Sequence, residues 1–198
     1  MNSLEYEIIM NSKKMINSEK LEEIQKGIEM LEDLANQKNK YALYELAKLY
    51  QEGKVVQKNI KKACNLFIFS GELGNNKSFY NAGKIFLEIN DEETAKRFFE
   101  KAKYSPLANL ELGKIYQRKM TSYHKAFSYF YEASKLGSPE ADYILADCFI
   151  LGKGVKVNIQ KGAYYLQRAL RKGIKDKNHL IKMIGDKKIQ NKLINSIN

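Results

Sequence analysis

The sequence has few of the residues that build disulfide and metal sites. Its 198 residues include two cysteines, two histidines, two prolines and no tryptophan. Two cysteines cannot form a disulfide framework, so the composition suits a reducing cytoplasm. We expect Cys64 and Cys148 to be buried, inert thiols. Apolar residues make up 44% of the chain, which is enough for a folded core and argues against disorder.

The first residues, MNSLEYEIIMNSKKM, lack the features of an export signal. Acidic residues stand where a signal peptide would be basic. The apolar run Ile8, Ile9 and Met10 is too short for a signal core or a membrane span. We therefore expect a cytoplasmic protein with no membrane span.

No group of residues has the spacing of a catalytic or metal site. His124 and His179 lie far apart, and the patterns HExxH and CxxC are absent. Neighbouring carboxylates such as Glu22 and Glu23 are typical of a solvated helix face, whereas acid/base catalysis needs carboxyl groups in different environments. We expect no enzyme activity, no metal and no cofactor.

Positive charge concentrates near the C-terminus. Residues 153–198 contain twelve Lys or Arg and two Asp, which accounts for nearly all of the net charge of +11. Such a basic pole can attract nucleic acid, an anionic membrane or an acidic protein, and charge alone does not choose among them. The candidate residues of this pole are Arg168, Arg171, Lys172, Lys175, Lys182, Lys187 and Lys188.

One helical pattern recurs four times along the chain. It is present as ALYELAKLY, SFYNAGKIF, ANLELGKIY and ADYILADCF at residues 42–50, 78–86, 108–116 and 141–149. Small residues align at two columns and an aromatic residue at a third, which places them on one buried stripe of a helix. A second helix is predicted after each, at 61–74, 93–103, 124–137 and 160–173. No segment is predicted as a strand.

Caps and stops divide these helices into hairpins. Asparagine, aspartate, serine and threonine can cap helix starts through their side-chain oxygens, and glycine or proline often ends a helix. The candidate caps are Asn59, Asn90 or Asp91, Thr121 or Ser122, and Asn158, and the candidate stops are Gly74, Gly137, Gly173 and Pro106.

The stretch GKGVKVNIQKGAYY at 152–165 raises the question of a phosphate-binding loop, because two glycines lie beside lysines. It aligns with GKVVQKNIKKACNLF at 53–67, which lacks the second glycine. Both stretches lie between two predicted helices, whereas a phosphate loop follows a strand. We therefore interpret Gly152 and Gly154 as parts of a tight turn, Val155 as an apolar pin beneath it and Asn158 as the next helix cap.

These columns resemble the SEL-one-like repeat, a short relative of the tetratricopeptide repeat. The fourth unit matches the pattern A-x3-L-[AG]-x2-Y-x2-G-x-G-V-x3-[DN]-x2-K-A from Ala141 through Gly154 to Lys161, and the first from Ala42 to Ala63. The resemblance covers about residues 40–173, and units two and three lack the Gly-x-Gly-Val loop. It implies an all-α fold, a right-handed α-solenoid of stacked helix hairpins.

We expect a single repeat domain over residues 1–198, with repeats at 39–75, 76–106, 107–139 and 140–176. Residues 1–38 are predicted to form N-terminal capping helices, in which 19–37 looks like a second helix without its first. Residues 177–198 are predicted to form a basic C-terminal capping helix. Caps are needed because each hairpin buries its face only against the next.

The resemblance also predicts a partner-binding surface. Positions 44 and 48 lie about 200° around the helix from 42 and 46, and the corresponding face lines the concave groove of tetratricopeptide-like solenoids. The residues at these columns are Tyr44, Tyr80, Leu110 and Tyr143, followed by Lys48, Lys84, Lys114 and Asp147. Lysines beside aromatic rings would suit an acidic peptide or an acidic protein surface. A solvated face of a lysine-rich helix is the plainer alternative.

Three classes of function follow. The first is a non-enzymatic scaffold or adaptor for a protein partner, as a bacterial regulator, effector or toxin-immunity partner. The second is a nucleic-acid-binding protein that uses the basic pole, although no recognition helix or RNA-binding aromatic platform is present in the sequence. The third is a small hydrolase, which would have to work without a histidine.

Overall fold

The computed structural model describes residues 3–118 and 122–175, together with 187, 190, 191, 194 and 195. These residues form helices and turns, and none of them lies in a strand. The helices are α1 (Ser3–Ile16), α2 (Leu21–Asn36), α3 (Lys40–Glu52), α4 (Ile60–Glu72), α5 (Asn76–Glu88), α6 (Glu92–Lys101), α7 (Pro106–Arg118), α8 (Tyr123–Lys135), α9 (Pro139–Leu151) and α10 (Ile159–Arg171). The all-α expectation is confirmed.

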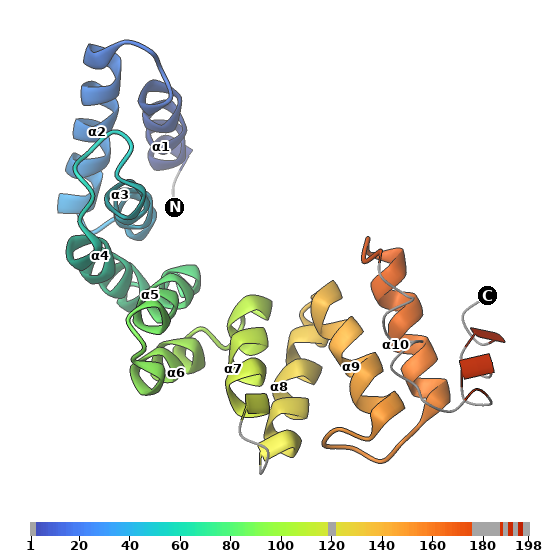
Figure 1. Ribbon diagram of the computed structural model, residues 1–198. Helices are drawn as coiled ribbons and strands as arrows, with labels where there is room; N and C mark the ends of the chain where they lie inside the picture. Colours follow the sequence, from blue (N-terminus) through green and yellow to red (C-terminus); the bar gives the residue numbers. More distant parts are fainter. Residues whose placement is uncertain (1–2, 119–121, 176–186, 188–189, 192–193, 196–198) are drawn as a thin grey trace. The chain divides into compact units, whose positions relative to one another are not determined.

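Consecutive helices pack as hairpins (Figure 1). The chain divides into two compact units, Met1–Ala102 and Lys103–Asn198. The first unit contains the hairpins α1–α2, α3–α4 and α5–α6, and the second contains α7–α8 and α9–α10. Within the units, α2 packs on α3, α4 on α5 and α8 on α9, so that hairpins stack on their neighbours. The single repeat domain stays a prediction, and the predicted cap at 177–198 lies largely outside the described residues.

Each hairpin is built around one large side chain from its second helix. These side chains are fully buried, and they are Leu31, Phe67, Phe99, Phe130 and Leu166. In the second hairpin of the repeat region, the ring of Phe99 packs directly on Gly83, where an added Cβ would lie 2.5 Å from the ring. Phe130 packs on Gly113 in the same way. In these two hairpins the glycine of the small-residue column leaves room for the ring against the backbone of the first helix.

The N-terminal hairpin follows the same plan, which corrects one expectation. The segment 19–37 was expected to lack a first helix, but α1 pairs with α2. A Cβ on Gly27 would meet the carbonyl oxygen of Ser12 and the side chain of Ile16, as one on Gly162 would meet Ala146 and Ile150. The pattern of the first helices did not predict α1, because α1 has Ser12, flanked by polar residues, where the repeats have alanine or glycine.

Most predicted caps are confirmed. The side chains of Asn59, Asp91 and Asn158 accept hydrogen bonds from backbone N–H groups of the first turns of α4, α6 and α10. Gly74, Gly137 and Gly173 have φ of 91°, 97° and 100°, the left-handed conformation that glycine adopts beyond a helix end. Pro106 is different, because α6 already ends at Lys101 and the proline begins α7, where its missing N–H costs nothing.

Candidate partner-binding site

The predicted surface lies on the first helices of the hairpins, and in the first unit its tyrosines are anchored in the core. Tyr44 is half-buried and meets Phe67 edge to face, with ring centroids 5.7 Å apart. Tyr80 is half-buried and lies 5.9 Å from the Phe99 ring. Each tyrosine therefore packs on the large central side chain of its own hairpin and leaves only its outer part on the surface.

The lysine of α3 is paired with a carboxylate. Lys48 Nζ lies 3.3 Å from Glu45 Oε2, and Lys13 of α1 reaches Glu45 Oε1 at 3.1 Å. Lys48 also lies 5.9 Å from the centre of the Tyr44 ring. Lys84 on α5 is exposed. The surface of this unit thus carries a compensated charge at α3 and a solvent-exposed lysine at α5.

Leu110 is not on the surface, contrary to the prediction. It is 2% exposed and belongs to the core cluster around Phe130 and Ala126. The column of Tyr44, Tyr80 and Leu110 lies at the flank of the first helix, against the large residue of the second. From this position a tyrosine is long enough to reach solvent, whereas a leucine ends inside the core.

The charged residues of the second unit also form ion pairs. Lys114 Nζ lies 3.3 Å from Glu111 and 3.0 Å from Glu140, so it links α7 to α9. Burial lowers the pKa of Lys114, but the hydrogen bond and charge of Glu140, together with Glu111, outweigh it and raise the pKa. Asp147 Oδ2 lies 2.8 Å from Lys153, while its Oδ1 is buried without a hydrogen-bond partner among the described residues. Tyr143 is half-buried and packs against the core cluster of this unit.

The predicted basic pole is partly used inside the fold. Arg168 and Lys172 lie 3.1 Å and 2.9 Å from the carboxylate oxygens of Asp142, whose side chain is fully buried. Ser134 donates a hydrogen bond to the same carboxylate, and Arg168 donates to the Ser134 carbonyl oxygen. This network ties α8, α9 and α10 together, so two of the seven pole residues are engaged. Arg171, Lys175 and Lys187 are exposed, and Lys182 and Lys188 lie outside the described residues.

Asp142 is the charged residue that the sequence analysis missed. It follows the small residue Ala141, at the column occupied by Leu43 and Phe79 in the first unit and by Asn109 in the second. All four side chains at this column are buried. An aspartate at a column that holds leucine and phenylalanine elsewhere was a signal in the sequence, because a buried carboxylate needs cationic partners.

The described residues show neither a metal-binding cluster nor a reactive thiol. No group of three or more His, Cys, Asp or Glu in this part of the chain is placed to hold a metal ion. Cys64 and Cys148 are buried, and burial raises the pKa of both thiols, that of Cys148 to about 12. A thiol with so high a pKa is a poor nucleophile at neutral pH. His124 is exposed, and His179 lies outside the described residues.

None of the described helices is long and apolar enough to cross a membrane.

The hairpins coincide with a known repeat. The Sel1 repeat model matches residues 40–75, 78–104, 106–138 and 139–174, which together are more than half of the chain. The chain belongs to the Sel1 repeat family. The four matches correspond to α3–α4, α5–α6, α7–α8 and α9–α10, and the hairpin α1–α2 lies before them. The Sel1 repeat fold is typically a non-catalytic scaffold for protein partners.

Solved structures share this fold. A Sel1 repeat protein from Oxalobacter formigenes is 16% identical with a TM-score of 0.76, covering 98% of this chain and 86% of that one. A protective antigen of uropathogenic Escherichia coli with an SLR fold is 20% identical with a TM-score of 0.74, and the match covers 99% of this chain but 44% of that protein. An immunity protein from Pseudomonas aeruginosa is 20% identical with a TM-score of 0.59, covering 100% and 81%. No curated protein shows a significant match to the sequence.

Proposed function

We propose that this Sel1 repeat protein is a non-enzymatic scaffold that holds a partner protein on a first-helix face in each unit. This face consists of Tyr44, Lys48, Tyr80 and Lys84 in the first unit and of Lys114, Tyr143 and Asp147 in the second. The observation that carries the proposal is the repetition of half-buried tyrosines, fixed by core rings, beside lysines and carboxylates. Rigid aromatic anchors beside fixed charges are typical of protein interfaces.

The partner is proposed to present an acidic surface or an acidic peptide to this face. Lys84 is exposed, and the side chains of Lys48 and Lys114 each keep 38% of their surface accessible despite their ion pairs. An incoming carboxylate can therefore contact these ammonium groups from the solvent side. The existing pairs hold the lysines in place, which lowers the entropic cost of binding.

The role is proposed to be that of a bacterial cytoplasmic regulator, effector or toxin-immunity partner. The three similar structures come from bacteria, and one of them is an immunity protein. The unbridged, buried cysteines suit a reducing compartment.

The test is capture of the native partner, followed by charge reversal on the face. The triple variant Lys48→Glu, Lys84→Glu and Lys114→Glu is expected to weaken binding of the identified partner at least about tenfold in calorimetric titration, because three attractive contacts become repulsive. The matched control reverses Lys54, Lys101 and Lys156, which lie in loops and a second helix, and should change Kd less than about threefold. Equal effects of the two variants would rule out a role for this face.

A further inference from the structure

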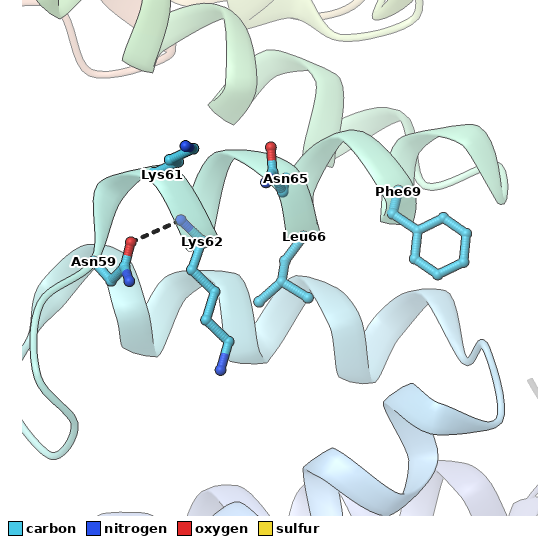
Figure 2. Close-up of a pocket in the computed structure, with 6 residues that line it drawn as sticks. All are labelled: Asn59, Lys61, Lys62, Asn65, Leu66 and Phe69. Atoms are coloured by element: carbon cyan, nitrogen blue, oxygen red, sulfur yellow. Dashed lines mark hydrogen bonds between the residues drawn. The ribbon is translucent and has the colours of Figure 1, made fainter.

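A second surface of the first unit lies beside α4, on the side of the second helices (Figure 2). One hollow of about 440 Å³ is lined by Asn59, Lys61, Lys62, Asn65, Leu66 and Phe69. A hollow of about 500 Å³ shares Lys62, Leu66 and Phe69 with it and extends over α2 and α3, where Glu32, Lys38, Leu43 and Tyr50 are among its lining residues. We call the two together the α4 groove. It is separate from the first-helix face.

The floor of the α4 groove is apolar. Leu66 is half-buried and packs against two core clusters, and Leu43 and Leu46 lie beneath the groove, 3% and 4% exposed. Phe69 remains 38% exposed, whereas Phe67 on the same helix is fully buried. In Figure 2, Lys62, Leu66 and Phe69 extend from the same side of α4. Their spacing of four and three residues places an ammonium group and two apolar side chains on one stripe of the helix.

The rim of the α4 groove carries positive charge. Lys38, Lys61 and Lys62 line it, against the single lining carboxylate of Glu32. Among the described ion pairs, none includes any of these three lysines, in contrast to Lys48 and Lys114. Lys62 Nζ donates to the Tyr50 hydroxyl at 2.6 Å and lies 4.0 Å from the centre of that ring. These neutral partners fix the ammonium group without cancelling its charge.

We infer that the α4 groove binds a short acidic amphipathic segment of a partner protein. One large apolar side chain of this segment contacts Leu66 and Phe69, and its carboxylates face Lys38, Lys61 and Lys62. The stretch from Asn59 to Phe69 spans about 15 Å, or about three helical turns, which fits a segment of roughly ten residues. The apolar floor disfavours nucleic acid, and the basic residues near the C-terminus of this chain would be repelled by the rim. The inference rests on the proposed scaffold function but uses a different surface.

The experiment is selection of a phage-displayed library of random 12-residue peptides on the 198-residue chain. Enriched peptides are expected to combine at least two Asp or Glu with a Leu or an aromatic residue. Synthetic, fluorescein-labelled copies are then titrated with the protein by fluorescence anisotropy. Lys61→Glu and Phe69→Ser, tested separately, are each expected to raise Kd about tenfold, because each removes one of the two features that define the groove.

The matched control is Lys77→Glu on α5, which makes the same charge change at an exposed position of the same unit, outside both the groove and the first-helix face, and should leave Kd within about twofold. Circular dichroism melts establish that each variant is folded. Enriched peptides without acidic bias, or affinities that Lys61→Glu and Phe69→Ser leave unchanged, would overturn the inference. So would concentration-dependent self-association that Phe69→Ser abolishes, because the occupant would then be a second copy of this chain.

The two proposals fail in different ways. If binding of the native partner requires Lys48, Lys84 and Lys114, but the selected peptides do not bind at the α4 groove, only the inference about the groove is wrong. If selected acidic peptides bind the groove but no native protein is captured through the first-helix face, the proposed function of that face fails and the groove stands.

Discussion

Asp142 is the residue whose role depends most on its surroundings. Its carboxylate is fully buried between three helices and contacts Ser134, Arg168 and Lys172. Leu43 and Phe79 occupy the same column in the first unit. The buried space that an apolar side chain fills there is filled at Asp142 by a carboxylate. A buried carboxylate has to keep its cationic partners, because the alternative is an uncompensated charge in a low dielectric.

Asp142→Asn is expected to lower the free energy of unfolding of the second unit by about 3 kcal/mol, because it leaves Arg168 and Lys172 without their counter-charge. Urea unfolding followed by circular dichroism measures this loss. The control is Glu132→Gln, which removes an exposed pair with Lys135 and should cost less than about 1 kcal/mol. A loss below about 1 kcal/mol for Asp142→Asn would mean that solvent already compensates the two cations.

The loop between α9 and α10 shows how a glycine pattern can have two causes. Gly152 and Gly154 have φ of 73° and 74°, so both use the left-handed conformation. Gly154 also lies against the start of α8, where an added Cβ would overlap the carbonyl group of Tyr123. Val155 is half-buried against the core, as predicted for the pin beneath the turn. In the loop between α3 and α4 Val55 stands at the position of Gly154, and its φ is not positive.

Gly154→Ala is expected to cost about 3 kcal/mol, because it adds overpacking against α8 to the strain of a positive φ. Gly137→Ala is the matched control, since Gly137 has φ of 97° but no atom within 4 Å of an added Cβ. That variant should cost about 1–2 kcal/mol from strain alone. The measurement is urea unfolding of both variants. Equal losses of unfolding free energy in the two variants would show that the loop shifts to accommodate the added methyl group without displacing α8.

The helix α1 differs from the other first helices on its outer face. The small column of the repeats, Ala42, Ser78, Ala108 and Ala141, is buried. The equivalent position of α1 is Glu7, which is exposed. We propose that α1 caps the hairpin stack with a polar face, as repeat proteins require at their ends.

The chain has a net charge of +11, and residues 153–198 account for nearly all of it. Many individual charges are compensated locally, as at Lys48, Lys114, Arg168 and Lys172. An excess of this size still attracts polyanions over several ångströms, whatever the biological partner.

We expect the protein to bind a heparin column at low salt. The salt concentration at which it elutes should depend only on its net charge. The pair Arg171→Glu and Lys175→Glu, at the basic pole, should then lower the eluting salt concentration as much as the pair Lys54→Glu and Lys101→Glu elsewhere. All four lysine and arginine side chains lie at exposed positions. A clearly larger effect at the pole would contradict this expectation and support nucleic-acid binding there.

The hairpins and their central packing were predictable because the information is local. A glycine or alanine at one column and a large residue at another recur at helical spacing, and Asn59 and Asn158 stand directly before the helices they cap. The prediction that Leu110 lies on the surface was wrong, because the angular position of a residue around a helix does not tell how far its side chain reaches. The ion pair of Lys48 with Glu45 could be predicted from their spacing of three residues on one helix. The second contact of Glu45 could not, because it comes from Lys13 on another helix.

The amino-acid pattern was sufficient for the family, the helices, their caps and the buried aromatic columns, because these follow from periodicity within about forty residues. The partners of each charge required the packed hairpins. Arg168 and Lys172 meet Asp142 across roughly thirty positions of sequence, and the α4 groove combines residues of α2, α3 and α4. Charge and hydrophobicity are properties of single residues, whereas burial and compensation arise when separate helices come together.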